Sequence, residues 1–164
     1  ETRIATGLGL GIGDAIFTGA LREVLNSKRT VEEALILRPF PQAGPREDLK
    51  GLWEAYRKEI ISHAGIALFL MGNKEQDGSI VQAEGLVREF EIAREQGVVL
   101  LPVGATSYAA EMLADRALND AAAYLPQFDD EGLKLLRALS ERTDNLNTLI
   151  EPISALIKRL QQGR

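Results

Sequence analysis

Four glycines occupy alternate positions near the start of the chain, at 7, 9, 11 and 13. Because glycine brings no side chain to a core, packing does not explain this run. A backbone without side chains can turn tightly and offer bare N–H groups to an anion at the start of a helix. The run therefore predicts a phosphate site made by the backbone of five residues: Gly9, Leu10, Gly11, Ile12 and Gly13.

The spacing of these glycines differs from the dinucleotide-binding fingerprint, in which a third glycine follows at a fixed distance. In the two possible alignments that place is taken by Asp14 or by Ile12. The second predicted strand also ends in Arg38, where an acid would hold an adenosine ribose. An ordinary NAD-dependent oxidoreductase is therefore disfavoured, and glycines in a surface turn that binds nothing remain the alternative.

Three basic residues are placed where they could neutralise a phosphate. Arg57 lies inside the apolar arc of a predicted helix, between Trp53 and Ile61, where an unpaired guanidinium would cost several kcal/mol. Arg38 and Lys74 each follow a predicted strand, at the edge where open α/β sheets bind ligands. The structural alternatives are a solvated Lys74 in a loop and an Arg57 that pairs with a carboxylate or with backbone groups.

Glu89 is the carboxylate that could complete such a site, because it lies on the inward arc of its predicted helix. A carboxylate there could accept hydrogen bonds from ribose hydroxyls or pair with Arg57. Phe40, between two prolines, would line the pocket beside Arg38. His63 is the single histidine, and the sequence has no metal-ligand cluster, no catalytic triad order and no GxxxxGK loop. We therefore expect no catalytic residue, no metal and no cofactor.

The elements that would position these residues alternate between apolar strands and helical patterns. Strands are predicted over 3–6, 34–37, 66–71 (fully buried) and 98–103, with helices over 13–26, 47–64 and 83–96 and a polar loop over 72–79. Continuous apolar strands joined by helices predict an α/β fold with a Rossmann-like parallel sheet sandwiched by helices. Helical patterns over 107–122, 129–142 and 145–161 follow. We expect a core over 1–125 and a C-terminal helical extension over 126–164, packed on the core or on a partner copy.

Composition limits the function classes. The 164 residues are 45% hydrophobic and 26% charged, as in a soluble globular domain, and carry a net charge of −5 that argues against nucleic-acid binding. We expect neither a membrane partner nor a signal peptide, and a cytoplasmic location is the default. Cysteine is absent, which excludes disulfides and thiolate metal sites. The chain starts without Met and almost directly at the glycine run, so we expect a fragment of a longer protein.

Five segments together resemble the SLOG domain of Thoeris anti-phage effectors. They are GLGLGIGDAIFTGA (7–20), LRPFP (37–41), YRKEIISHAGIALFLMGNK (56–74), GLVREFEIA (85–93) and LPVGAT (101–106), and they extend over most of 1–125. In that family the domain lies C-terminal to a sirtuin-like domain that cleaves NAD. The resemblance implies a sensor for a cyclic ADP-ribose isomer, or for ADP-ribose or a related nucleotide, whose binding changes the assembly of the effector and activates NAD cleavage.

The resemblance also implies which residues and partners carry this function. The matching positions are the glycine run, Arg57, Asn73 and Lys74 in the GNK triplet, and Glu89. The implied partners are the nucleotide messenger, an attached sirtuin-like domain and further copies of the chain, as a homodimer or higher homo-oligomer. Because the sirtuin-like part is not in this sequence, the domain itself is expected to be a sensor and not an enzyme.

Three alternatives stay open. The first is a nucleotide phosphoribohydrolase of the cytokinin-activating type, although the PGGxGT turn of those enzymes is reduced to a remnant at 85–89. The second is an NADP-binding domain with Arg38 on the 2′-phosphate. The third is an assembly domain in which the pocket stays empty.

Overall fold

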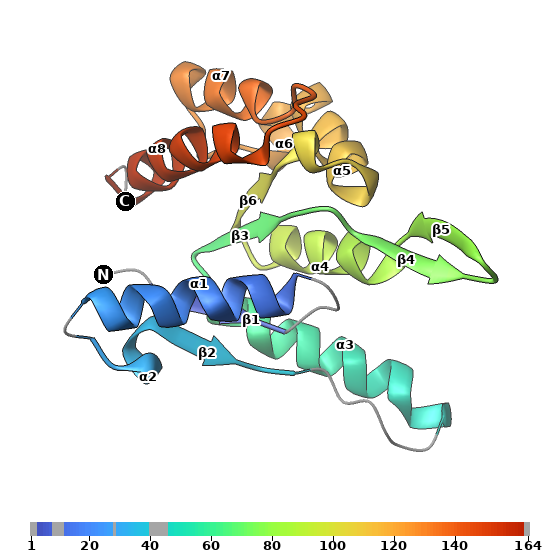
Figure 1. The fold of residues 1–164 in the computed structure, drawn as a ribbon. Coiled ribbons are helices and arrows are strands. Elements are labelled where there is room, and N and C mark those ends of the chain that lie inside the picture. The colour runs from blue at the N-terminus through green and yellow to red at the C-terminus, as the bar shows by residue number, and fades with distance from the viewer. Residues whose placement is uncertain (1–2, 8–11, 28, 40–45, 163–164) are drawn as a thin grey trace. The chain divides into compact units, whose positions relative to one another are not determined.

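The computed structural model describes residues 3–7, 12–27, 29–39 and 46–162. The chain forms two compact units, Glu1–Ala64 and Gly65–Arg164, each of which is described by itself. Each unit contains one pair of parallel strands together with helices (Figure 1). The predicted α/β class with parallel strands and a helical C-terminal part is therefore confirmed.

The first unit is built around a short parallel strand pair. Its elements are β1 (Ile4–Thr6), α1 (Gly13–Asn26), α2 (Val31–Ala34), β2 (Leu35–Leu37) and α3 (Arg46–Ser62). In the register of β1 and β2, Ile4 lies opposite Leu35 and Thr6 opposite Leu37. The short helix α2 is absent from the sequence prediction and takes Ala34 from the predicted strand. A capping box explains it, since the side chains of Thr30 and Glu33 each accept a hydrogen bond from the other's backbone.

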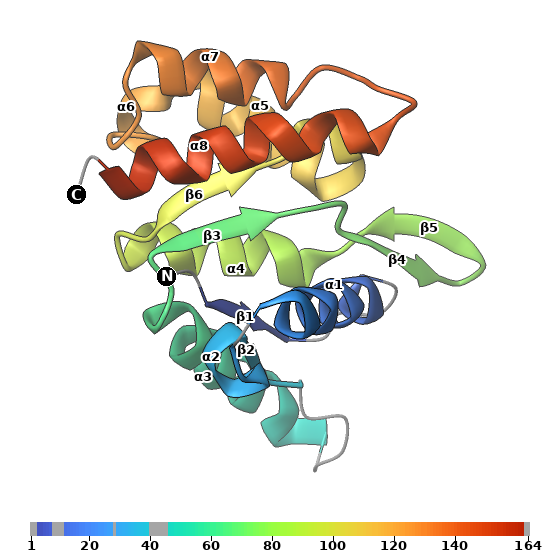
Figure 2. The same ribbon diagram turned by 60° about the vertical axis from the view of Figure 1, so that its left-hand side comes forward.

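The second unit holds most of the buried core. It starts with β3 (Ile66–Phe69), β4 (Asn73–Gln76), β5 (Ser79–Gln82), α4 (Glu84–Glu95), β6 (Val99–Pro102) and the 3₁₀ turn η1 (Gly104–Thr106). It continues with α5 (Tyr108–Asn119), α6 (Ala121–Tyr124), α7 (Asp130–Ala138), η2 (Leu146–Leu149) and α8 (Ile150–Gln162). β3 and β6 pair in parallel, and every residue of β6 is buried. Within this unit, α8 runs across β6 and alongside α7 (Figure 2), while α4 contacts both β3 and β6 and also contacts α5.

An aromatic cluster joins α4 to its neighbours in this unit. The fully buried Phe90 meets Phe69 of β3 edge to face, with ring centroids 5.2 Å apart, and lies 5.7 Å from the ring of Tyr124. The guanidinium of Arg94 lies over the ring of Tyr124, 4.4 Å from its centre. Such pairs add to the burial energy of the rings, so Phe90 fixes α4 on the sheet.

The helices at the C-terminal end pack inside their own unit. The backbone N–H of Ala105 donates to the carbonyl of Leu139 at 2.9 Å, and Gly104 faces the backbone of Ser140 so closely that a Cβ there would approach it at 3.1 Å. Leu139 and Leu156 are completely buried. One face of the C-terminal helices is therefore covered by the same unit that contains β3 and β6.

Several predicted boundaries are wrong, for local reasons. Residues 72–79 do not form a loop, because β4 and β5 form an antiparallel hairpin closed by Asp77 and Gly78, both at positive φ. The sequence of these two strands is too polar to show the alternating apolar pattern of a strand, although its Asp-Gly pair favours this turn. The third strand is not buried throughout, since it ends at Phe69 and Leu68 is 42% exposed. The helix predicted over 107–122 is interrupted at Asp120, whose carboxylate caps α6.

Candidate functional site

One edge of the first unit brings Arg38 to the start of the glycine run. Since β1 and β2 are parallel and in register, their carboxyl ends coincide. The backbone N–H of Arg38 donates to the carbonyl of Thr6 at 2.9 Å, and Gly7 follows Thr6 directly. The Arg38 residue is exposed. The backbone of a basic residue is therefore held at the carboxyl edge of the strands, where α/β sheets bind ligands.

The N-terminus of α1 follows the same glycine run. Ile12 precedes the helix and has no side-chain acceptor with which to cap it, while Gly13 is the first helical residue and is buried. The carbonyl of Ile12 accepts the first helical hydrogen bond, from Ile16 at 3.1 Å. The uncapped N–H groups at a helix start favour an anion. Gly9, Leu10, Gly11 and Phe40, which complete this part of the predicted site, lie outside the described residues.

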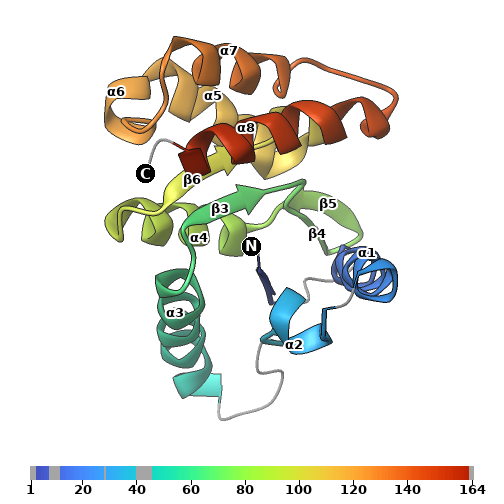
Figure 3. The same cartoon turned by 90° about the vertical axis from the view of Figure 1, so that its left-hand side faces the viewer.

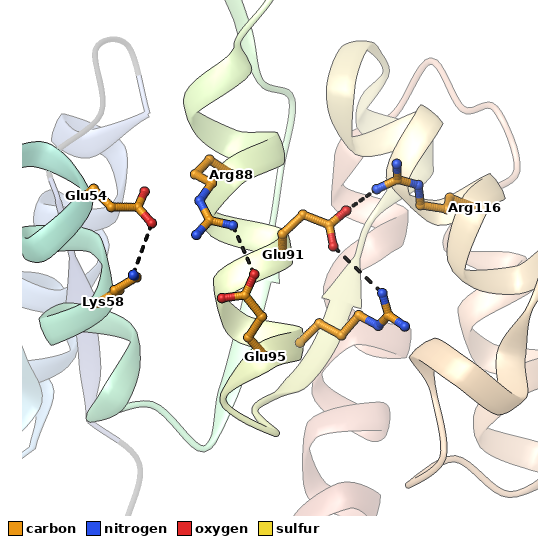
Figure 4. Close-up of polar contacts among 7 residues, drawn as sticks. Glu54, Lys58, Arg88, Glu91, Glu95 and Arg116 are labelled. Atoms are coloured by element: carbon orange, nitrogen blue, oxygen red, sulfur yellow. Dashed lines mark hydrogen bonds and ion pairs between the residues drawn. The ribbon is translucent and has the colours of Figure 1, made fainter. Parts of the chain in front are cut away.

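Arg57 lies on α3 as the helical wheel predicts. The residue is half-buried, between the half-buried Trp53 and the buried Ile61, and it takes part in interactions with the surrounding structure. On the solvent side of the same helix, Lys58 pairs with Glu54 at 3.4 Å (Figure 4). Arg57 is therefore less exposed than Lys58, its neighbour on the same helix.

The hairpin of the second unit carries the next two predicted residues, Asn73 and Lys74. Both belong to β4, so the prediction that Lys74 lies in a loop is wrong. In the hairpin, Lys74 lies opposite Val81, and its ammonium group lies 3.9 Å from a carboxylate oxygen of Glu84, the first residue of α4. A strand backbone holds Lys74 more firmly than a loop would, and it places the cation beside the start of α4.

Glu89 is half-buried on α4 and takes part in interactions of its own, so the carboxylate is not isolated. Of the other acids of this helix, Glu84 lies near Lys74, and Glu91 and Glu95 pair with arginines. Glu91 is bridged by Arg116 of α5 and, at 3.9 Å, by Arg94, and Glu95 lies 3.1 Å from Arg88 (Figure 4). Glu91 is half-buried like Glu89 and is directed toward α5, so the role of Glu89 on the inward arc stays a prediction of the helical wheel.

The carboxyl end of β3 has a feature that the sequence analysis missed. Met71 and Gly72 have φ values of 55° and 86°, and Ser107 and Tyr108, after β6, have φ values of 67° and 57°. Positive φ in residues other than glycine costs about 1–3 kcal/mol and often marks functional edges. In the sequence, the small residues within the segments 72–74 and 104–107 are the signal that could have indicated these positive φ values.

Three hydrogen bonds hold this strained edge. The N–H of Met71 donates to the Thr106 hydroxyl at 2.8 Å, and that hydroxyl donates to the carbonyl of Val103 at 2.7 Å. The carbonyl of Met71 accepts from Ala110, in the first turn of α5, at 2.9 Å. The hairpin with Asn73 and Lys74 therefore leaves the sheet from a fixed point.

The structure thus forms two partial groups. In the first unit, Arg38 lies at the start of the glycine run, which leads to the N-terminus of α1. In the second unit, Lys74 lies beside the start of α4, the helix that carries Glu89. Their union in one pocket stays a prediction of the sequence. Among the described residues, no three potential metal-ligating side chains of His, Cys, Asp or Glu form a group, and no helix is long and apolar enough to cross a membrane.

Comparison with known proteins assigns the chain to a family. Residues 1–160 match the model of the Sir2- and TIR-associating SLOG family. The chain is 38% identical over 165 residues to a protein from Cytobacillus dafuensis named NAD(+) hydrolase ThsA, covering 99% of the chain and 33% of that protein. It is 39% identical to the protein of the same name from Acinetobacter baumannii, covering 95% of the chain and 34% of the relative. The chain thus spans about a third of the length of these relatives.

Proposed function

Because the chain belongs to the Sir2- and TIR-associating SLOG family, we propose that it is the regulatory ligand-sensing domain of a Thoeris effector. It binds a cyclic ADP-ribose isomer without converting it. Binding changes how copies of the protein assemble and activates an attached sirtuin-like domain that cleaves NAD. The relatives named NAD(+) hydrolase are about three times as long as this match, which supports a catalytic part elsewhere in such proteins.

The observation that carries this proposal is the bond between the Arg38 N–H and the Thr6 carbonyl. It holds the backbone of Arg38 at the strand edge from which the glycine run starts, so that the guanidinium can reach a ligand bound there. A pyrophosphate bound by the backbone of residues 9–13 and by the start of α1 would be neutralised there by Arg38 and Arg57. Phe40 would line the site next to them.

The second unit contributes the remaining groups of the proposed site. Lys74 and Asn73 would contact the pyrophosphate from the hairpin, and Glu89 would accept hydrogen bonds from ribose hydroxyls. Charge-assisted hydrogen bonds of this kind contribute about 1.5–3 kcal/mol each. Loss of one contact should therefore weaken binding roughly ten- to hundred-fold.

Calorimetry with cyclic ADP-ribose isomers and with ADP-ribose tests this site. Arg57→Ala and Glu89→Gln should each weaken the preferred ligand ten- to hundred-fold, whereas Arg142→Ala, at an exposed position of the C-terminal part, should leave the affinity unchanged. Equal affinities in all three variants would remove the proposed site. Circular dichroism of each variant shows whether the fold is retained.

A second candidate is an NADP-binding domain, favoured by the exposed Arg38 immediately after β2. A basic residue at this place can hold the 2′-phosphate of NADP. A thermal-shift screen distinguishes the two, because a larger stabilisation by NADP than by any cyclic ADP-ribose isomer would favour this candidate. Release of free base from nucleoside monophosphates, followed by chromatography, would instead favour a phosphoribohydrolase.

A further inference from the structure

Among the described residues of the second unit, Tyr108 is the one exposed aromatic residue. It is 42% exposed. The other aromatic residues of this unit are buried or half-buried: Phe69, Phe90, Tyr124 and Phe128. A single exposed ring is ordinary on a protein surface and by itself indicates nothing. What distinguishes Tyr108 is the conformation of its backbone and the position at which that backbone is held.

The backbone at Tyr108 is strained. Tyr108 has a φ of 57°, and Ser107 before it has a φ of 67° and a ψ of −173°, a combination that is almost restricted to glycine. Positive φ in a bulky residue is rare. The turn is nevertheless fixed, since the N–H of Ser107 donates to the carbonyl of Gly104 at 2.9 Å. Because strained residues cluster at ligand-binding edges, this conformation points to a function of the residue that it positions.

Two contacts hold the start of α5 against the turn that follows β3. The N–H of Ala110 donates to the carbonyl of Met71 at 2.9 Å, and the Cβ of Ala109 lies 2.9 Å from the position that an added Cβ on Gly72 would take. Both alanines are completely buried. Tyr108 directly precedes them, so it is the exposed residue next to this buried junction.

The same turn leads to the cation of the proposed nucleotide site. Since β3 and β6 are parallel, their carboxyl ends lie at one edge, and the hairpin that carries Lys74 leaves β3 there (Figure 3). The Lys74 ammonium group lies 3.9 Å from Glu84, and the Leu86 side chain of the same helix, α4, packs against Gly72. This edge of the second unit therefore combines an exposed aromatic residue, a cation and the first turn of α4.

From this arrangement we propose that the ring of Tyr108 stacks on the adenine base of the bound nucleotide, while Lys74 contacts the pyrophosphate. The inference rests on the proposed function and adds the group that holds the base. Every nucleobase presents a flat π face, and stacking on an aromatic side chain binds it without a hydrogen bond to a base edge. A fixed backbone at Tyr108 lowers the entropy that is lost when the ring is immobilised.

Calorimetry with cyclic ADP-ribose isomers and ADP-ribose tests the stacking. Tyr108→Ala should weaken the tightest of these nucleotides roughly five- to hundred-fold, whereas Tyr108→Phe keeps the ring and should stay within two- or three-fold of the wild type. Equal losses in both variants would overturn stacking. Wild-type affinity in Tyr108→Ala beside weakened binding in Lys74→Ala would overturn it too and leave the proposed function intact. A wild-type chain that binds none of these nucleotides would overturn both.

Nuclear magnetic resonance separates stacking from support of the fold. In tyrosine-labelled chain saturated with the same nucleotide, nuclear Overhauser effects should connect the Tyr108 ring protons with H2 or H8 of adenine. The Tyr108 signals are those lost in Tyr108→Phe, and Tyr124→Phe is the matched control that should keep these cross-peaks. Alanine at 108 keeps the same backbone strain, so Tyr108→Ala should melt within a few degrees of the wild type. Cross-peaks to another tyrosine, or none, would overturn the proposal.

Discussion

Asp129 at the start of α7 binds Arg159 near the end of α8 with both oxygens of its carboxylate. The Arg159 Nε donates to Asp129 Oδ1 at 2.8 Å and to Oδ2 at 3.0 Å, and a terminal guanidinium nitrogen also donates to Oδ2. The same carboxylate caps α7 by accepting from the N–H of Gly132 at 2.9 Å. The Asp129 side chain therefore both caps the start of α7 and binds α8.

This pair predicts an acid-sensitive contribution to stability. The hydrogen bond from Arg159, followed by that from Gly132, lowers the pKa of the Asp129 carboxyl from 3.8 to about 2. Because the pKa is lower in the folded chain than in the unfolded chain, the carboxylate stabilises the fold fully above about pH 4. That stabilisation is lost as the pH falls from about 4 toward 2.

Asp129→Asn separates the ion pair from the helix cap, since asparagine still caps a helix well. The variant should be less stable than the wild type at pH 7, with a melting midpoint lower by a few degrees, and the difference should narrow between pH 4 and pH 2. Thermal unfolding of the variant and of the wild type at pH 4 and at pH 2 measures this difference in melting midpoint. Because both side chains are about half exposed, the effect should also shrink at high salt. A difference that is constant with pH would contradict the role of the charge.

Gly72→Ala should destabilise the second unit by about 2–4 kcal/mol. An added Cβ would lie 2.4 Å from a Leu86 side-chain carbon and 2.9 Å from the Ala109 Cβ, at a φ of +86°. Gly97→Ala is the matched control, because Gly97 has a φ of +70° and open space around the Cβ position. It should cost only about 1–2 kcal/mol, and equal losses in urea denaturation would show that the clash is relieved.

Thr106→Val should release the strained end of β3. The substitution keeps the shape of the side chain but removes the hydroxyl that accepts from Met71, at a cost of about 1–3 kcal/mol. Hydrogen exchange of the Met71 amide reports this directly and should become faster. Thr106→Ser keeps the hydroxyl and should keep the amide protected, so fast exchange in both variants would argue that packing of the methyl group holds the turn.

Lys74→Ala should weaken nucleotide binding roughly ten- to hundred-fold with little change in stability. Its pair with Glu84 spans 3.9 Å between side chains that are 40% and 91% exposed, and such surface pairs contribute at most about 1 kcal/mol. Glu84→Gln breaks the same pair and should leave the affinity for the nucleotide within two- or three-fold of the wild type. Calorimetry and thermal unfolding on both variants separate a ligand contact from a structural one.

The positions of several candidate residues on their helices and strands were predictable, because they depend on period and order along the chain. The apolar arc of α3 predicts the half-buried Arg57, and the arc of α4 predicts the half-buried Glu89. The place of Arg38 follows from the position of a strand end, which two prolines mark in the sequence. The hairpin that carries Lys74 was not predictable from hydrophobicity, because a polar two-stranded sheet has no buried face to produce an alternating pattern.

The sequence alone determined the α/β class, the order of the main elements and the inward residues of the helices, since these follow from local periodicity. It also carried the resemblance that the family match confirms. Only the tertiary structure decided the strained turn at Met71 and the Asp129–Arg159 pair. Each of these joins residues that are distant in sequence, and no pattern along the chain encodes which of them meet.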